Sequence, residues 1–83
     1  MKLFGAAWCG PCNHTKAKLT AAGFDLVERE PVAPNEIQVV DIDQHIDLAR
    51  ENGVRGIPTL IDGEKRFTGF EPIWAELKDR LEA

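Results

Sequence analysis

Short apolar runs alternate with amphipathic stretches along this 83-residue chain, and the pattern predicts its secondary structure. Residues 2–6, "KLFGA", are apolar enough to form a buried strand. A helix is expected to begin at Cys9 or Gly10, because Pro11 fits a first turn, where its missing N–H costs nothing. Gly23 is a suitable stop for that helix. Three of its side chains fall on one side at helical spacing: Cys12, Leu19 and Ala22.

The second half of the chain repeats the alternation. Residues 36–42, "EIQVVDI", are rich in β-branched side chains and predict a strand. Asp43 is expected to cap a helix over residues 44–52. An Asp-Gly turn between residues 58–62 and 65–68 predicts a hairpin.

A last helix is predicted to open at Glu71-Pro72, and its apolar stripe comprises Ile73, Trp74, Leu77 and Leu81. Residues 24–35 are left open between an extended connection and a second helical piece, and Pro31 and Pro34 favour irregularity before residue 36. The predicted order is β-α-β-α-β-β-α. This describes an α/β fold in which a four-stranded mixed sheet is covered by three helices. Its first two strands are expected to be parallel.

Composition places the chain among ordinary globular proteins, with 43% hydrophobic and 29% charged residues, and we expect one domain over residues 1–83. The net charge of -4 argues against nucleic acid as a partner, since phosphate binding normally needs a basic face. No apolar stretch has the length of a membrane span, and the first residues do not resemble a signal peptide. We therefore expect a cytoplasmic protein with no membrane partner.

Both cysteines lie in "WCGPC", residues 8–12. Disulfide exchange needs a thiolate, an accessible sulfur and a second thiol to resolve the mixed disulfide, and this stretch offers all three. Cys9 sits where a strand meets a helix N-terminus, which lowers a thiol pKa, and Cys12, one turn later, should be more buried. Two alternatives stay open. One is an inert disulfide, although so short a link restrains little chain. The other is a zinc site, for which the unusually spaced set is Cys9, Cys12, His14 and His45.

Two motifs resemble the thioredoxin superfamily: "AWCGPC" at residues 7–12 and "GVRGIPTL" at residues 53–60. The resemblance implies that Cys9 and Cys12 form a redox-active disulfide. It also implies that the Ile57–Pro58 bond is cis and faces that bridge, where an extended substrate can hydrogen-bond to the backbone as an added strand. The substrate surface implied in this way comprises Trp8, Gly10, Pro11, Ile57, Pro58 and Gly69.

The chain begins directly with the strand that leads to the cysteines, which is typical of glutaredoxin-type architecture. Residues 12–25, "CNHTKAKLTAAGFD", and 67–72, "FTGFEP", resemble the NrdH-type redoxins, which combine a glutaredoxin-like fold with a thioredoxin-like activity and typically serve ribonucleotide reductase. The matching residues are Thr15, Lys16, Gly23, Phe24, Asp25, Gly69, Phe70 and Pro72.

The chain departs from the superfamily pattern in its proton handling. Leu3 stands where thioredoxins place a buried carboxylate, and Val39 stands where they place its partner lysine. Asp41 and Asp43 are candidates for moving the proton of Cys12, with a solvated acid and a helix cap as the alternative interpretation.

The chain also departs from the glutaredoxin pattern for glutathione. Phe70 adds bulk where glutaredoxins carry the second glycine of a Gly-Gly pair, so we expect weak or no glutathione binding.

These features together predict a monomeric thiol-disulfide oxidoreductase without a bound cofactor or metal. Cys9 attacks a protein disulfide, Cys12 resolves the mixed disulfide, and thioredoxin reductase restores the dithiol. Ribonucleotide reductase is a candidate partner. The alternatives are a glutathione-coupled glutaredoxin and a non-catalytic binding module of the same fold.

Overall fold

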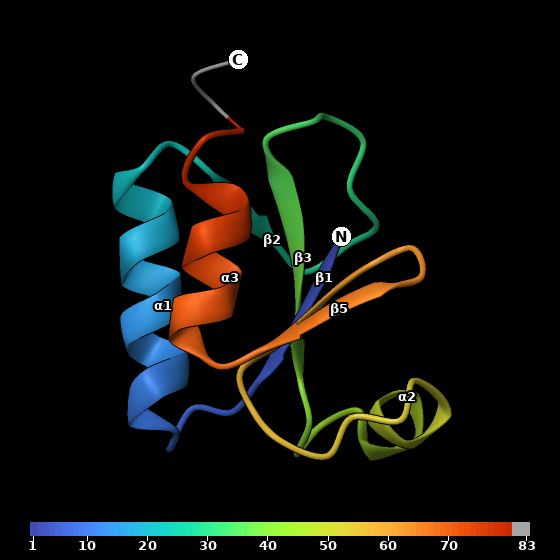
Figure 1. Cartoon of the computed structure of the whole chain (residues 1–83). Helices are drawn as coiled ribbons and strands as arrows, with labels where there is room; N and C mark the ends of the chain where they lie inside the picture. The colour runs from blue at the N-terminus through green and yellow to red at the C-terminus, as the bar shows by residue number, and fades with distance from the viewer. Residues whose placement is uncertain (81–83) are drawn as a thin grey trace.

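The computed structural model describes residues 1–80, which form an α/β fold with a mixed sheet and three helices (Figure 1). None of these helices has the length and apolar character needed to cross a bilayer. In chain order the elements are β1 (Lys2–Gly5), α1 (Gly10–Ala21), β2 (Asp25–Val27), β3 (Glu36–Asp41), α2 (Ile46–Glu51), β4 (Thr59–Asp62), β5 (Lys65–Thr68) and α3 (Phe70–Leu77).

The strands lie in the order β2-β3-β1-β4-β5 within residues 1–80. Strand β1 is central: it pairs parallel with β3, with Gly5 opposite Asp41, and antiparallel with β4, with Leu3 opposite Leu60. Strands β4 and β5 form the antiparallel hairpin predicted from the Asp-Gly turn. The expectations of a parallel first pair and a terminal hairpin are therefore confirmed.

The predicted four-stranded sheet is wrong by one strand, because β2 (Asp25–Val27) adds a parallel edge beside β3. The prolines that argued for an irregular connection come after this strand, in residues 28–35. Three residues of strand span only about 10 Å, so a short loop can return the chain to the start of β3 without a helix. A strand this short carries little sequence pattern of its own.

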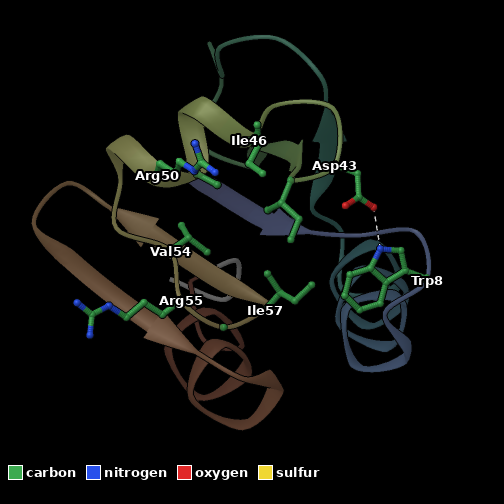
Figure 2. Close-up of a pocket in the computed structure, with 10 residues that line it drawn as sticks. Trp8, Asp43, Ile46, Arg50, Val54, Arg55 and Ile57 are labelled. Carbon is green, nitrogen blue, oxygen red and sulfur yellow. Dashed lines mark hydrogen bonds between the residues drawn. The ribbon is translucent and has the colours of Figure 1, made fainter.

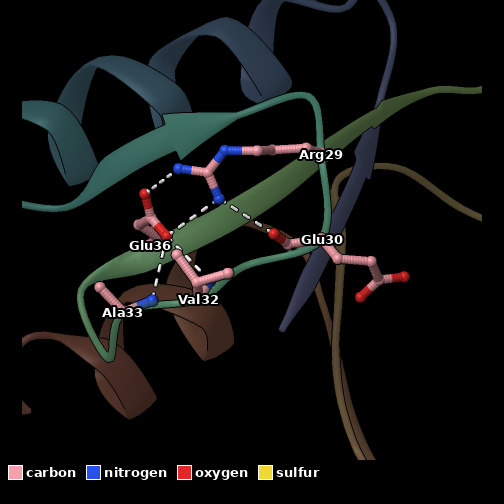
Figure 3. A network of polar contacts seen from close by, with 5 residues as sticks. All are labelled: Arg29, Glu30, Val32, Ala33 and Glu36. Carbon is pink, nitrogen blue, oxygen red and sulfur yellow. Dashed lines mark hydrogen bonds and ion pairs between the residues drawn. The ribbon is translucent and has the colours of Figure 1, made fainter.

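Glu36 closes that loop (Figure 3). Its carboxylate pairs with Arg29 at 2.5 Å and accepts the backbone N–H groups of Val32 and Ala33 at 2.9 and 3.0 Å. The hydrogen bond from Arg29, followed by these two backbone bonds, lowers the pKa of Glu36 to about 2. The loop is thus held by a charged side chain that is itself buried.

Helices α1 and α3 lie side by side on one face of the sheet, and α2 lies on the opposite side (Figure 1). Neighbouring residues of β1 accordingly serve two cores, as the two-residue period of a strand requires. Leu3 joins the larger cluster, with Leu19, Phe24, Ile37, Leu60, Ile73 and Leu77. Phe4 joins the smaller one, with Val40 and Ala49.

The buried faces of α1 and α3 follow the predicted pattern, except that Thr15 is buried in place of Ala22. Trp74 packs against the larger cluster as expected, and Leu81 lies outside the described residues. On α1 the buried side chains are Cys12, Thr15 and Leu19, whereas Ala22 is exposed. Thr15 can be buried because its hydroxyl donates to the Pro11 carbonyl at 2.7 Å.

The predicted cap of the second helix is wrong. Helix α2 begins at Ile46, and its N-cap is His45, whose side chain makes no capping hydrogen bond. The preceding residues form a turn in which the Asp41 carboxylate accepts the Asp43 N–H at 2.8 Å. The Asp43 carboxylate instead accepts a hydrogen bond from the Trp8 side chain, which is distant in the sequence.

Candidate redox site

Cys9 and Cys12 form a disulfide at the N-terminus of α1, with their Cα atoms 5.2 Å apart. Cys9 is the N-cap residue of this helix, and its sulfur accepts the backbone N–H of Cys12 at 3.2 Å. The first turn carries no acidic side chain, so the partial positive charge of the helix end is not offset there. This position favours a thiolate at Cys9 when the bridge is reduced.

Both cysteines are buried, and Cys9 is the more exposed of the two, at 6% against 1% for Cys12. Attack on or by Cys9 therefore has to proceed from the outer side of the helix end. That side carries three exposed residues of the predicted substrate surface, namely Trp8, Gly10 and Pro11.

The Ile57–Pro58 peptide bond is cis, as the resemblance implied. Ile57 packs against the small cluster formed by Ala6, Cys9 and Cys12. The loop is held on both sides: the Thr59 hydroxyl donates to the Gly56 carbonyl at 2.5 Å, and the Pro58 carbonyl accepts the Gly69 N–H at 2.8 Å. The structure thus brings Ile57 and Pro58 to the bridge and ties Gly69 to them.

Gly69 is the N-cap of α3 and has φ of 95°, a conformation that a residue with a Cβ rarely adopts. The next residue, Phe70, places its ring edge-on to His14 of α1, with centroids 4.5 Å apart. A phenyl ring therefore occupies the space between the N-terminal parts of α3 and α1. Phe70 is the residue that stands where glutaredoxins carry the second glycine of a Gly-Gly pair.

Trp8 is 69% exposed, yet its indole N–H donates to the Asp43 carboxylate at 2.7 Å. This bond joins the loop before α1 to the loop after β3 and fixes one end of a pocket of about 390 Å³ (Figure 2). Ile57 lines the same pocket, so the pocket lies beside the disulfide. Its remaining lining comes from Ile42 in the loop after β3, from α2 and from the loop between α2 and β4.

The inner side of Cys12 lies against the sheet. A Cβ added to Gly5 would lie 3.2 Å from both Cβ and Sγ of Cys12, so only a glycine fits there without displacement. Leu3, at the position of the thioredoxin carboxylate, is buried in the apolar cluster. The immediate surroundings of Cys12 on β1 therefore supply no ionisable group.

The nearest strand beyond Gly5 does supply one. Asp41 is the register partner of Gly5 in a parallel pair, so its side chain leaves the sheet on the face that α1 covers. It lines a polar hollow of about 250 Å³ together with Lys16, Glu28, Val39, Gln44 and His45. Of the two acids proposed from the sequence, Asp41 shares a sheet face with Cys12, whereas Asp43 binds Trp8.

The zinc alternative finds no support in residues 1–80, where no three histidine, cysteine or acidic side chains gather as ligands. His14 lies against Phe70, and His45 lines the polar hollow.

The sequence interpretation missed two residues of the site, Arg50 and Arg55, which line the pocket beside Trp8 and Ile57. Arg55 stands inside the "GVRGIPTL" motif, two residues before Ile57, so its position near the bridge was available as a signal. No sequence motif pointed to Arg50, because only the packing of α2 brings this residue to the pocket.

Comparison with known proteins agrees with this geometry. The family model described as Thioredoxin matches residues 3–81. The chain is 32% identical over 74 residues to thioredoxin of Mycoplasma genitalium and 35% identical over 74 residues to thioredoxin of Bacillus subtilis. Each match covers 83% of this chain, which spans 67% of the first relative and 66% of the second.

Among solved structures, the fold resembles NrdH-redoxin from Escherichia coli, described as a glutaredoxin-like protein with a thioredoxin-like activity profile. The TM-score is 0.62 at 22% identity, covering 92% of this chain and 91% of that one. This likeness concerns the fold alone. On the family match and the two thioredoxin relatives, the chain belongs to the thioredoxin family and is a redox protein with a Cys-x-x-Cys pair.

Proposed function

We propose that the protein is a thiol-disulfide oxidoreductase that reduces disulfides of other proteins. The observation that carries this proposal is the Cys9–Cys12 disulfide at a helix N-terminus, directly beside the cis Ile57–Pro58 loop. The cysteine pair at the helix N-terminus forms a stabilised thiolate, and the cis-proline loop presents its backbone to an extended substrate.

The reaction begins from the reduced dithiol. The Cys9 thiolate attacks one sulfur of the substrate disulfide, forms a mixed disulfide and expels the other substrate sulfur as a thiolate. Cys12, deprotonated, then attacks the Cys9 sulfur, which restores the Cys9–Cys12 bridge and releases the second substrate thiol. Two electrons pass from the protein to the substrate, and the two protons of the dithiol end on the substrate thiols or in solvent.

The proton of Cys12 leaves through the polar hollow, with Asp41 as its acceptor across water. The support is the shared sheet face of Asp41 and Cys12 and the close approach of Cys12 to Gly5, the register partner of Asp41. Asp41 acts here through water, at the edge of the site.

The bridge is re-reduced by an NADPH-dependent thioredoxin reductase, and ribonucleotide reductase is a candidate substrate. The resemblance of residues 12–25 and 67–72 to the NrdH-type redoxins supports both suggestions. The Phe70 ring beside His14 supports weak or no use of glutathione. The protein works in the cytoplasm as a monomer and needs no bound cofactor, because both electrons reside in the two cysteines.

The test couples reduction of a protein disulfide to NADPH consumption, with either thioredoxin reductase or glutathione plus glutathione reductase as the electron source. We expect turnover with the first source, loss of turnover in Cys9→Ser, and a trapped mixed disulfide in Cys12→Ser by mass spectrometry. Turnover only with glutathione would identify a glutaredoxin. Undiminished activity of Cys9→Ser would overturn the proposed role of Cys9. A partner that binds the Cys9→Ser/Cys12→Ser variant as tightly as the wild type, without turnover, would favour a binding module.

A further inference from the structure

The pocket beside the disulfide is an apolar groove open to solvent. We call it the Trp8 groove and define it by Trp8, Ile46, Val54 and Ile57, with Arg50 and Arg55 among its lining residues (Figure 2). Three large hydrophobic side chains in residues 1–80 are prominently exposed, and two of them, Trp8 at 69% and Ile46 at 54%, lie in this groove. Exposed apolar surface concentrated at one site indicates contact with a partner.

The charge of the groove is polarised along its length. At one end, the Asp43 carboxylate is already bound by the Trp8 indole. Toward the other end, Arg50 lies beside Ile46, whereas the Arg55 side chain extends outward from the rim of the groove (Figure 2). Neither arginine forms an ion pair with any residue between 1 and 80. Two unpaired cations in one groove run against the net charge of -4 of the whole chain.

The segment that carries these two cations is held in place. The Arg66 side chain of β5 donates to the Gly53 carbonyl at 3.1 Å and also to the Asn52 carbonyl. Both carbonyls belong to the stretch between Arg50 and Arg55. The backbone that positions the arginines is thereby fixed before any partner binds, which lowers the entropy lost on binding.

We propose that the Trp8 groove selects acidic partner segments. An apolar side chain of the substrate enters between Trp8 and Ile57, and carboxylates further along the same segment pair separately with Arg50 in the groove and with Arg55 at its rim. This inference rests on the proposed function, because it assumes that the reacting disulfide of the substrate lies over Cys9.

The polarity of the groove also fixes the order of these features along the substrate. The reacting cysteine lies nearest Cys9, the apolar residue follows it into the groove, and the acid lies beyond, away from Asp43. A substrate with lysines in the last position would meet Arg50 and Arg55 with like charge, and would be disfavoured.

The experiment uses three peptides with the same internal disulfide and a leucine beside it, followed by two glutamates, two glutamines or two lysines. Binding is measured with the Cys9→Ser/Cys12→Ser protein, so that no reaction is required, and reduction is measured with the wild type. The variants Arg50→Glu and Arg55→Glu are each compared with Lys65→Glu. Lys65 is an exposed residue of β5 outside the groove, and its substitution alters the net charge equally.

We expect the glutamate peptide to bind better than the glutamine peptide by about 1.4- to 5-fold for each ion pair formed, with the lysine peptide weakest. High salt should abolish the ranking. Arg55 lies in a loop, so Arg55→Glu should lower or reverse the preference for the glutamate peptide without disturbing a helix. Arg50→Glu should act in the same direction, with its fold checked by urea unfolding. Lys65→Glu should leave the preference unchanged.

Equal binding of the three peptides, or an effect of Lys65→Glu as large as that of the arginine variants, would overturn the inference. The proposed function fails separately, if the wild type binds with the expected preference but does not reduce the peptides.

Discussion

Gly5 is the residue whose replacement tests most directly how the sheet supports the redox pair. It lies at the end of β1, and Cys12 packs directly on it. A methyl group built at this position would lie 3.2 Å from Cβ and from Sγ of Cys12. Ordinary carbon contacts lie at about 3.5–4.0 Å, so Gly5→Ala requires a displacement of about half an ångström.

That displacement is costly because Cys12 has nowhere to move. It is 1% exposed, its Cβ is fixed by the first turn of α1, and in the oxidised protein its sulfur is bonded to Cys9. Overpacking of this kind costs about 1–3 kcal/mol. A domain of this size has a free energy of unfolding of about 4–12 kcal/mol. The variant should therefore fold but be clearly less stable.

Urea unfolding followed by circular dichroism measures the effect in both redox states. With a slope of about 1 kcal/mol/M, the midpoint should fall by about 1–3 M. The matched control is Gly10→Ala, because no atom lies within 4 Å of the added methyl group. The control shares the loss of glycine freedom in the unfolded chain, so the difference between the two variants reports the contact together with the helix propensity that alanine gains at Gly10.

We expect Gly5→Ala to be destabilised relative to Gly10→Ala in the reduced and the oxidised protein alike, since the contact with Cβ of Cys12 does not depend on the S–S bond. Equal midpoints for the two variants would refute the close packing of Cys12 on β1. The assignment of Asp41 to the same face as Cys12 would then lose part of its support.

Three further predictions concern polar groups. The pKa of Glu36 is lowered, so the ionised carboxylate stabilises the folded protein fully above pH 4.5 and loses this effect as the pH falls toward about 2. The difference in urea midpoint between wild type and Glu36→Gln should therefore shrink over that pH range. Asp41→Asn should slow resolution of the mixed disulfide by roughly tenfold in a stopped-flow assay, less than for direct proton transfer because water intervenes. Asp47→Asn, on the exposed side of α2, should leave this rate unchanged. Asp43→Ala should lower the free energy of unfolding by about 1 kcal/mol and shift the Trp8 fluorescence, and Asp43→Asn, which keeps an acceptor for the indole, should restore most of both.

The elements that the sequence predicted well are those whose signals are local. The β-branched run of β3, the Asp-Gly hairpin and the proline in the first turn of α1 each specify their own backbone, and each lies where it was expected. The pairing of Cys9 with Cys12 is local in the same sense, because both lie within one helical turn. The position of Ile57 beside them depended on the family motif, since no periodicity connects residues 48 positions apart.

The errors have the opposite character. Asp43 has the composition and spacing of a helix cap, but a tryptophan 35 residues earlier takes its carboxylate. Strand β2 exists because the edge of β3 offers hydrogen-bond partners to three residues whose own pattern is weak. In both cases a tertiary contact overrides a local preference, and only the assembled structure reveals the contact.

The surroundings of the two cysteines differ in a way that matches the proposed division of labour. Cys9 caps the helix, and its cluster packs against Ile57 beside the Trp8 groove, which suits the proposed attacking thiolate and substrate surface. Cys12 packs on Gly5, which constrains its position, and Asp41 in the polar hollow, on the sheet face that α1 covers, is its proposed proton acceptor. Leu3 stands on β1 at the position of the thioredoxin carboxylate, and the candidate acid of this chain, Asp41, lies on the neighbouring strand β3. Under the proposed mechanism, Leu3 at this position therefore relocates proton transfer to β3 without removing it, and the attacking role stays with Cys9.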